Sequence, residues 1–193
     1  MFNFSDKYQL ILASGSPRRQ QFFKDLDLAF EVRLKEIEEV YPSHLKAEAI
    51  TNYLSELKAN AFEGALADNE LLITSDTIVW HNEKALGKPK NAADAFQMLQ
   101  SMSGTTHEVI TSVTFKTNAF TDTLHEVTKV TFSALNEAEI QYYIDKYVPY
   151  DKAGSYGIQE WIGLIAISKI EGSYTNVVGL PTEKVVHYLK NVV

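Results

Sequence analysis

Short apolar runs alternate along this chain with stretches in which apolar side chains recur at helical spacing. The run YQLILA at 8–13 has the length and composition of a buried strand. The run WIGLIAI at 161–167 also has strand length, and it leads into a strand expected to end near Ile170. On the same grounds we expect strands at 8–13, 30–34, 71–80, 109–116, 124–133 and 164–170.

Capping residues indicate where several helices begin. Ser16 as N-cap and Pro17 at the first helical position predict a helix that ends near Asp27. The side chains that this helix would bury are Phe22, Phe23 and Leu26. Asn136, with Glu139 three positions later, resembles a capping box and predicts a helix over 136–147.

The longest amphipathic stretch predicts one helix from Ser43 to about Ala67. Its apolar positions, at roughly helical spacing, are Leu45, Ala49, Tyr53, Leu57 and Ala61. Further helices are expected from Asn91 to Gly104, where the glycine would close the helix, and over 182–190. The residues HNEK at 81–84 predict a hairpin turn before Leu86.

Helices that alternate with strands predict an α/β fold, and the two long neighbouring strands at 109–133 indicate a mixed central sheet flanked by helices. No linker, repeat or low-complexity segment divides the chain, so residues 1–193 are expected to form a single domain. A chain of this length also fits one domain split into two lobes around a substrate cleft.

Composition and charge exclude several classes of function. The chain has no cysteine, so thiol nucleophiles, disulfides and cysteine–metal sites are excluded. Its net charge of −7 argues against a partner that is a nucleic acid or an anionic membrane surface. No apolar run is long enough for a membrane span, and the N-terminus lacks the pattern of a signal peptide. We therefore expect a soluble, cytoplasmic protein.

The segment LILASGSPRR at 10–19 is the most informative for chemistry. A buried strand ends in small residues, and a helix begins at once with Arg18 and Arg19, two of only three arginines in the chain. A helix N-terminus with guanidinium groups suits a phosphate, and Ser14 would let a ligand approach the backbone. An ordinary capped helix with two solvated arginines explains the pattern equally well. The segment is not a P-loop, because GxxxxGK[ST] is absent.

Polar residues inside the apolar run at 71–80 form the second candidate feature. Ser75, Asp76 and Thr77 are expected to interrupt the strand, where Asp76 would offer a carboxylate to a divalent cation or a water. A strand boundary with an Asx turn is the alternative. Glu39 ends the acidic run EIEE at 36–39, and such runs are usually solvated faces.

Two lysines and a glutamine complete the set of candidates. Lys58 lies within the predicted long helix, whereas Lys88 is held between Gly87 and Pro89 in a loop. The small residues around Gln159 in KAGSYGIQE at 152–160 would suit a nucleobase read by an amide that both donates and accepts hydrogen bonds. Taken singly, these features are also explained as a surface lysine, a plain turn and a flexible connector. The histidines show no metal-ligand spacing, and neither GxSxG nor GxGxxG occurs.

Together these segments resemble the Maf family of nucleoside triphosphate pyrophosphatases. The matching segments, in family order, are SGSPRR at 14–19, IEE at 37–39, KA at 58–59, SDTIV at 75–79, GKP at 87–89, SGTTH at 103–107, AGSYGIQ at 153–159, GSY at 172–174 and GLP at 179–181. They run from about Leu10 to the last helix. The resemblance implies a Maf/ITPase-like fold and hydrolysis of a nucleoside triphosphate to the monophosphate and pyrophosphate.

The resemblance also assigns roles to residues. It implies that Asp76 accepts a proton, that Lys58 and Lys88 assist catalysis, and that a divalent cation is bound by Asp76 and Glu39. That cation would be Mg²⁺, with Mn²⁺ as second choice. The residues implied to bind substrate are Ser14, Arg18, Arg19, Thr77 and Gln159, of which Arg18, Thr77 and Gln159 are associated with choice of base.

The Gly-Ile-Gln sequence at 157–159 is similar to the family branch that acts on dTTP and UTP rather than the branch that prefers 7-methyl-GTP. Two positions depart from the family pattern. Ser75 stands where alanine is common, and Glu160-Trp161 follows the glutamine where glycine is frequent, which could alter selectivity for the base. The resemblance further implies a homodimer.

Two other classes of function remain open on the sequence. A nucleotidyltransferase would release pyrophosphate only with a phosphorylated acceptor, and the strand–loop at 10–19 loosely resembles that of sugar-nucleotide synthases. A nucleotide-binding regulator of cell division would bind dTTP or UTP without turnover.

Overall fold

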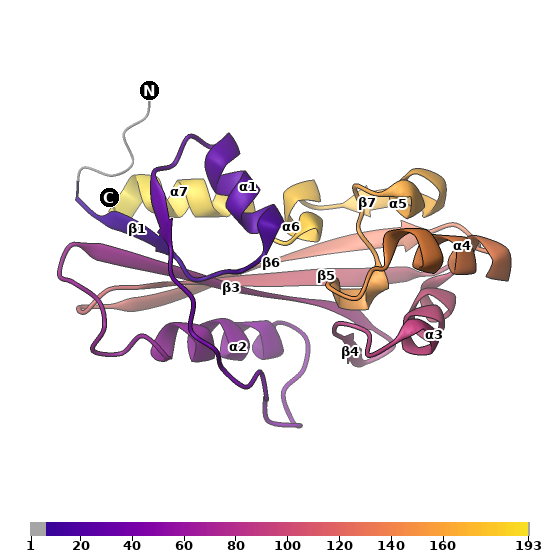
Figure 1. Ribbon diagram of the computed structural model, residues 1–193, viewed down its shortest axis with the longest axis horizontal. Helices are drawn as coiled ribbons and strands as arrows, with labels where there is room; N and C mark the ends of the chain where they lie inside the picture. The colour runs from indigo at the N-terminus through magenta and orange to yellow at the C-terminus, as the bar shows by residue number, and fades with distance from the viewer. Residues whose placement is uncertain (1–6, 193) are drawn as a thin grey trace. The chain divides into compact units, whose positions relative to one another are not determined.

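A seven-stranded mixed sheet organises the chain in the computed structural model, which describes residues 7–192 (Figure 1). Its strands follow the order β2-β1-β3-β5-β6-β7, and β4 pairs with β3. β1 is parallel to β2 and β3, whereas β4 and β7 are antiparallel to β3 and β6. The strands are β1 Gln9–Leu12, β2 Phe30–Val32, β3 Glu70–His81, β4 Lys84–Leu86, β5 Thr106–Lys116, β6 Thr121–Phe132 and β7 Ile167–Glu171.

Helices fall between most of these strands, so the predicted mixed sheet flanked by helices is confirmed. The helices are α1 Pro17–Asp25, α2 Glu48–Asn60, α3 Ala92–Met102, α4 Glu137–Tyr147, α5 Trp161–Ala166, α6 Tyr174–Val178 and α7 Thr182–Val192, with a 3₁₀ turn η1 at Ala153–Ser155. None of the helices within residues 7–192 combines the length and the apolar character needed to cross a membrane.

The chain divides into two compact units. The first unit comprises the residues up to Asp76, Thr111–Glu126 and those from Gly179 onward, and the second comprises Thr77–Ile110 and Val127–Val178. The long strands β3, β5 and β6 contribute residues to both units.

The first unit buries apolar side chains on both faces of its part of the sheet. Leu71 and Ile73 of β3 belong to a core that α1 and α7 cover, whereas Leu72 packs with residues of α2 and the turn that follows it. This alternation follows from the two-residue period of a strand. It places Asp76 on the same face as Leu72, toward α2.

The second unit has one core of its own. The buried side chains are contributed by β3, α3, β5, β6, α4, the segment around η1 and α5. Its largest fully buried side chains include Tyr143 and Phe132.

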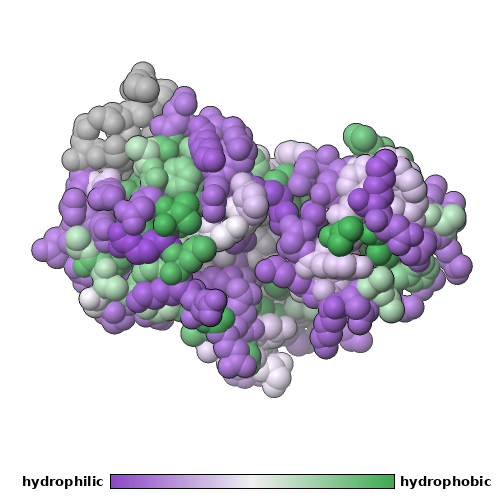
Figure 2. Space-filling view, viewed as in Figure 1, coloured by the Kyte–Doolittle hydropathy of each residue, from purple (hydrophilic) through white to green (hydrophobic). Residues whose placement is uncertain are grey.

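On the face seen in Figure 2, hydrophobic side chains occur in small groups among hydrophilic ones. Leu164 of α5, with 83% of its surface exposed, is the most exposed of the large apolar side chains described.

Capping and turn residues correctly predicted the start of α1, the start of α4 and the end of α3. α1 begins after Ser16 with Pro17 in its first turn, although the Ser16 side chain makes no capping hydrogen bond. Phe23 is buried, and Phe22 and Leu26 pack against the same core. The capping box of α4 is present, because the Asn136 and Glu139 side chains each accept a hydrogen bond from the other's backbone N–H. Gly104 follows α3 in a left-handed conformation with φ of 68°.

The predicted helix over 43–67 is wrong at both ends. α2 covers only Glu48–Asn60, since Ala47 before it has a left-handed φ of 47° and Gly64 lies in a turn after it. Its buried face also differs from the expected stripe, because Tyr53 is exposed. The buried residues are Ile50, Thr51, Leu54, Ser55 and Ala59.

Two strand predictions also need correction. β3 runs through Ser75, Asp76 and Thr77 without a break, because ladder hydrogen bonds join main-chain atoms whatever the side chains are. The apolar run at 161–167 forms the helix α5, and β7 begins only at Ile167. A short apolar run fits either state by periodicity alone.

Candidate active site

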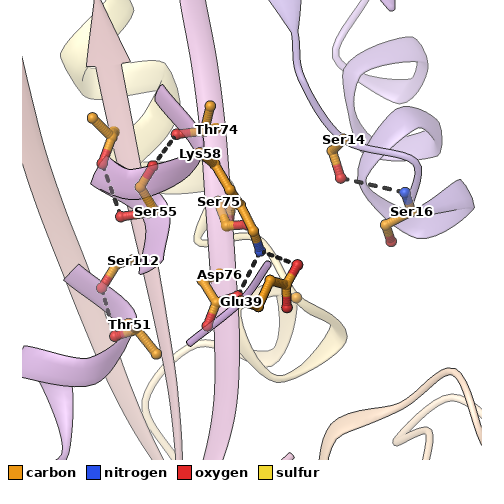
Figure 3. A network of polar contacts seen from close by, with 12 residues as sticks. Ser14, Ser16, Glu39, Thr51, Ser55, Lys58, Thr74, Ser75, Asp76 and Ser112 are labelled. Atoms are coloured by element: carbon orange, nitrogen blue, oxygen red, sulfur yellow. Dashed lines mark hydrogen bonds and ion pairs between the residues drawn. The ribbon is translucent and has the colours of Figure 1, made fainter. Parts of the chain in front are cut away.

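The turn between β1 and α1 is held by the side chain of Ser14. Its hydroxyl accepts a hydrogen bond from the Ser16 N–H at 3.3 Å, and its carbonyl accepts one from the Gln20 side chain at 3.1 Å. Ser14 is buried, and the small residues that follow it bring the chain directly into α1 (Figure 3). The first turn of the helix then presents Arg18 and Arg19.

Arg19 ties this turn to two other segments of the first unit. Its Nε donates to the Gly179 carbonyl at 2.8 Å, and its Nη1 donates to the Ser75 carbonyl at 2.8 Å. The same Nη1 lies 3.5 Å from the Ser14 hydroxyl. Burial lowers the pKa of Arg19 to about 10, against the opposing effect of Asp76, so this guanidinium is cationic at neutral pH. Arg18, half-buried beside it, adds a second positive charge that also lowers the pKa of Arg19.

Two carboxylates converge on one ammonium group at the end of α2 (Figure 3). The Nζ of Lys58 lies 2.7 Å from Oδ1 of Asp76 and 3.0 Å from Oε1 of Glu39. It also lies 3.5 Å from the Ser75 carbonyl that Arg19 contacts. Ser75 thus links the two cations through its main chain, and the five charged and polar groups form one cluster within the first unit.

The environment of Asp76 favours its protonated form. Asp76 is only 6% exposed, and this burial raises the pKa of its carboxyl above the usual value. Lys58 and then Arg19 oppose the shift, whereas the carboxylate of Glu39 adds to it. A carboxylate with a raised pKa is a stronger base than an ordinary aspartate, which is a property of catalytic bases.

Hydroxyl groups fix α2, and with it Lys58, on the sheet. Thr74 of β3 donates to the Ser55 carbonyl at 2.7 Å, and the Ser55 hydroxyl lies 2.8 Å from that of Thr114 in β5. One turn earlier, the Ser112 hydroxyl lies 2.6 Å from that of Thr51 (Figure 3). All five residues are fully buried. These paired groups explain why the buried face of α2 contains polar residues.

Asp76 and Glu39 are the two carboxylates to consider as ligands of a divalent cation. No group of three or more His, Asp or Glu in the described part of the chain is placed to hold a metal by itself. Mg²⁺ is commonly bound through one or two carboxylates, with phosphate oxygens and waters completing its octahedron. Asp76 and Glu39, which reach a common point at the Lys58 ammonium, supply such a pair of oxygen ligands.

Ser75, one of the two departures from the family pattern, contributes to the cluster through its carbonyl. That contribution would be the same with alanine at this position. Its buried hydroxyl has no hydrogen-bond partner among residues 7–192.

The second unit contains the remaining candidates. Thr77 directly follows Asp76 in β3 and is half-buried. Lys88 is exposed on the loop after β4, and Gln159 is exposed on the loop before α5. The Gly154 N–H donates to the Gly87 carbonyl at 3.0 Å, which joins these two loops.

The loop that carries Gln159 is held by hydrogen bonds to a buried tyrosine hydroxyl. The Tyr143 hydroxyl donates to Glu160 and accepts a hydrogen bond from the Gly157 N–H at 3.0 Å. Lys152 lies 3.1 Å from the other oxygen of the Glu160 carboxylate. Burial, followed by the bond to Glu160, raises the pKa of Tyr143, so its hydroxyl stays protonated and remains a donor.

The structure therefore gathers part of the predicted site within each unit. The residues brought together in the first unit are Ser14, Arg18, Arg19, Glu39, Lys58 and Asp76, and those in the second are Thr77, Lys88 and Gln159. Sequence reasoning missed the partners that hold these groups, such as Gln20, the Gly179 carbonyl and Tyr143. Their contacts join positions far apart in sequence or involve main-chain atoms, which carry no side-chain signal.

A family model, Maf-like protein, matches residues 9–192. The chain belongs to the Maf family. A relative named dTTP/UTP pyrophosphatase from Flavobacterium johnsoniae is 71% identical over 97% of this chain and 96% of its own length. Relatives of the same name from Flavobacterium psychrophilum and Bacteroides fragilis are 65% and 47% identical, over 95% and 96% of this chain and 94% and 96% of their own lengths.

The solved structure of a nucleoside-triphosphatase, dITP/XTP pyrophosphatase, from Mycobacterium abscessus aligns with 95% of this Maf chain and 96% of its own. Its TM-score of 0.45 and identity of 13% are too low for any functional argument.

Proposed function

We propose that this Maf protein is a nucleoside triphosphate pyrophosphatase that hydrolyses dTTP and UTP to the nucleoside monophosphate and pyrophosphate. The observation that carries the proposal is the charged cluster in which Asp76 and Glu39 share Lys58 while Arg19 and Lys58 share the Ser75 carbonyl. The Maf relatives at up to 71% identity, each named dTTP/UTP pyrophosphatase, support the choice of reaction and substrates.

In this proposal Asp76 is the general base. Its raised pKa makes it able to take a proton from the water that attacks the α-phosphorus, and Lys58 holds its carboxylate in place at 2.7 Å. The bond from the α-phosphorus to the bridging oxygen then breaks, and pyrophosphate leaves with the electron pair.

Cationic side chains would bind the triphosphate, which carries close to four negative charges at neutral pH. Arg18 and Arg19 lie in the first turn of α1, where the helix dipole adds to their positive charge. Ser14, which is small and buried, would let the phosphates approach the main chain beside these arginines. We assign Lys88 to the leaving pyrophosphate. Contacts of this kind lower the barrier most where they strengthen as charge moves onto the leaving group.

Asp76 and Glu39 would hold a divalent cation, Mg²⁺ or alternatively Mn²⁺, together with phosphate oxygens. When bound, the cation neutralises phosphate charge and makes the phosphorus more electrophilic. Since Lys58 contacts both carboxylates, it keeps them at one point before the nucleotide arrives.

For the nucleobase we propose contacts with Arg18, Thr77 and Gln159. An exposed amide that both donates and accepts can pair with the 4-carbonyl and N3–H of thymine or uracil. We further propose, from family resemblance, that residues 1–193 act as a single domain in a cytoplasmic homodimer, with no nucleic-acid or membrane partner.

Product analysis tests this function. The protein is incubated with dTTP, UTP, CTP or 7-methyl-GTP and Mg²⁺ or EDTA, without an acceptor. We expect monophosphate and pyrophosphate from dTTP and UTP, and no turnover with EDTA. Release of pyrophosphate only after addition of a sugar phosphate would instead indicate a nucleotidyltransferase, and tight binding without turnover would indicate a regulator.

A further inference from the structure

We propose that Glu160 is a positioning residue for nucleobase recognition, acting through Tyr143 and Lys152 on the loop that carries Gln159. This inference rests on the proposed function, because it concerns the same substrate. It also gives a physical role to a position at which the chain departs from its family's common glycine.

The loop is packed around the Glu160 carboxylate. A Cβ atom on Gly157 would lie 2.9 Å from Cδ of Glu160 and 3.1 Å from Cε of Lys152. A side chain at position 157 would therefore require the Glu160 carboxylate and the end of Lys152 to move away from the main chain. Gln159 follows two residues later, and Glu160 itself is the N-cap of α5.

The Tyr143 hydroxyl connects the helix α4 to both ends of this loop. It donates to Glu160 and accepts from the Gly157 N–H at 3.0 Å, so a single oxygen fixes the first residue of the Gly-Ile-Gln segment and the residue that follows it. The ring of Tyr143 is fully buried in the core of the second unit. The loop is thus anchored to rigid structure rather than to solvent-exposed groups.

Lys152 completes the arrangement by pairing with the carboxylate. Its side chain is 9% exposed and that of Glu160 is 19% exposed, so the two charges are shielded from water. Lys152 also lies 2.8 Å from Asp151. If Glu160 is removed, Lys152 keeps Asp151 as a partner, whereas the buried Tyr143 hydroxyl loses the carboxylate to which it donates.

The main chain at Gly154, which precedes the Gln159 loop, is also constrained. Gly154 has a left-handed φ of 66°, and a Cβ there would lie 2.6 Å from Cγ2 of Val79. With the Gly154 N–H bonded to the Gly87 carbonyl, the Gln159 loop is fixed both before and after its reading residue. A loop held in this way fixes the main chain from which the Gln159 side chain extends, so less loop entropy is lost on binding.

The test separates recognition of the base from recognition of the phosphates. For the wild type, Glu160→Ala, Glu160→Gln and Tyr143→Phe, kcat and KM are measured with dTTP, UTP and CTP. The inhibition constant of pyrophosphate serves as a probe without a base. Tyr147→Phe, one turn later on α4 and stacked on Tyr143, is the matched control.

We expect Glu160→Ala to raise the KM for dTTP and UTP at least tenfold and to reduce the preference for them over CTP. The kcat and the inhibition constant of pyrophosphate should change less than threefold. Glu160→Gln keeps an acceptor for Tyr143 and should recover most of the loss. Tyr143→Phe should raise the KM by about three- to tenfold, and Tyr147→Phe should leave it unchanged.

Each outcome decides a separate question. Wild-type turnover of dTTP with an unchanged KM in both Glu160→Ala and Tyr143→Phe would overturn this inference and leave the proposed function intact. Equal losses in kcat, KM and pyrophosphate binding would also overturn it, since they would indicate general damage. Absence of turnover in the wild type would overturn the proposed function itself.

Discussion

At the scale of single residues, Asp76 combines burial with two neighbouring cations. Burial raises its pKa, and Lys58 and Arg19 oppose this shift. Glu39 shares Lys58 with it and raises the pKa further. A base for water attack needs this balance between basicity and ionisation.

The first prediction concerns the base itself. Asp76→Asn keeps the size of the side chain but cannot accept the proton, so we expect kcat for dTTP to fall by about 10²–10⁴-fold. The unfolding midpoint should change little, because an amide oxygen can still accept from Lys58. Asp25→Asn, which changes an exposed carboxylate on α1, is the matched control. Near-normal turnover in Asp76→Asn would contradict the assignment.

The second prediction uses the pH dependence of the reaction. Asp76 must be ionised to act, so kcat/KM should rise with pH through an acidic limb that lies above the ordinary range of an aspartate. Glu39→Gln removes the carboxylate that raises this pKa, so the limb should move to lower pH when each protein is assayed at its own saturating Mg²⁺ concentration. The ionisation of dTTP is the same in both proteins and cancels in the comparison. A limb that moves to higher pH, or not at all, would contradict the account.

At the scale of elements, α2 shows that buried polar side chains can serve to fix the position of a helix on a sheet. Its contacts with the sheet include hydroxyl pairs as well as apolar packing, and the candidate site residue Lys58 is one turn beyond these pairs. An apolar stripe would let the helix settle in several positions, whereas paired hydroxyls are satisfied in one.

The third prediction follows from these pairs. Ser112→Ala removes a hydroxyl that lies 2.6 Å from Thr51 and 2.7 Å from the Asn52 side chain, leaving buried polar groups without this partner. We expect the free energy of unfolding to fall by about 1–3 kcal/mol in urea titrations. Ser168→Ala on β7, whose hydrogen bond is exposed, should cost less than about 0.5 kcal/mol. Equal costs for the two variants would show that the contacts at Ser112 are not stabilising.

Elements with explicit capping or turn residues could be predicted from the sequence, and the others could not. The Asn136 box and Gly104 act within a few residues, so their consequences are local. The start of α2 depends instead on the left-handed backbone of Ala47, which no residue preference indicates. In α5, Gly163 fits where a Cβ would lie 1.8 Å from the carbonyl oxygen of Ile158 in the preceding loop, a steric constraint that hydrophobic periodicity does not contain.

At the scale of the whole molecule, the stability of the fold depends on a buried histidine in the core of the second unit. Protonating this histidine in the folded state costs free energy. His107 is 1% exposed, packs against Phe132 and Tyr156, and lies 2.8 Å from the Tyr156 hydroxyl. Burial, with a smaller effect from His81, lowers its pKa to about 3. The unfolded chain therefore binds a proton that the folded chain does not.

The fourth prediction is the pH dependence of stability that results. Between the ordinary histidine value of 6.5 and about 3, the unfolded state holds more protons, so stability falls as the pH falls. His107 should account for a loss of about 2 kcal/mol between pH 7 and pH 5. His107→Gln should flatten this slope in urea titrations, and the exposed control His125→Gln should not. An unchanged slope in His107→Gln would contradict the assignment.

Most residues of the candidate site could be proposed from the sequence. The reason is their chemistry, whereas the fold elements were predicted from local capping and turn signals. Asp76, Lys58 and Arg19 bear charges that phosphate chemistry requires, and their ordered motifs resemble one family. The groups that hold the candidate residues are less visible: a main-chain carbonyl of Gly179 accepts from Arg19, and the buried hydroxyl of Tyr143 holds the loop that carries Gln159. Their role depends on contacts between distant segments, which a single sequence does not reveal.

The most direct test of the central claim is hydrolysis of dTTP in ¹⁸O-labelled water with Mg²⁺, followed by mass spectrometry of both products. If water attacks the α-phosphorus with Asp76 as base, the label will appear in dTMP and not in pyrophosphate, and Asp76→Asn will suppress both products. Label in pyrophosphate, or release of orthophosphate from the γ-position, would contradict the account.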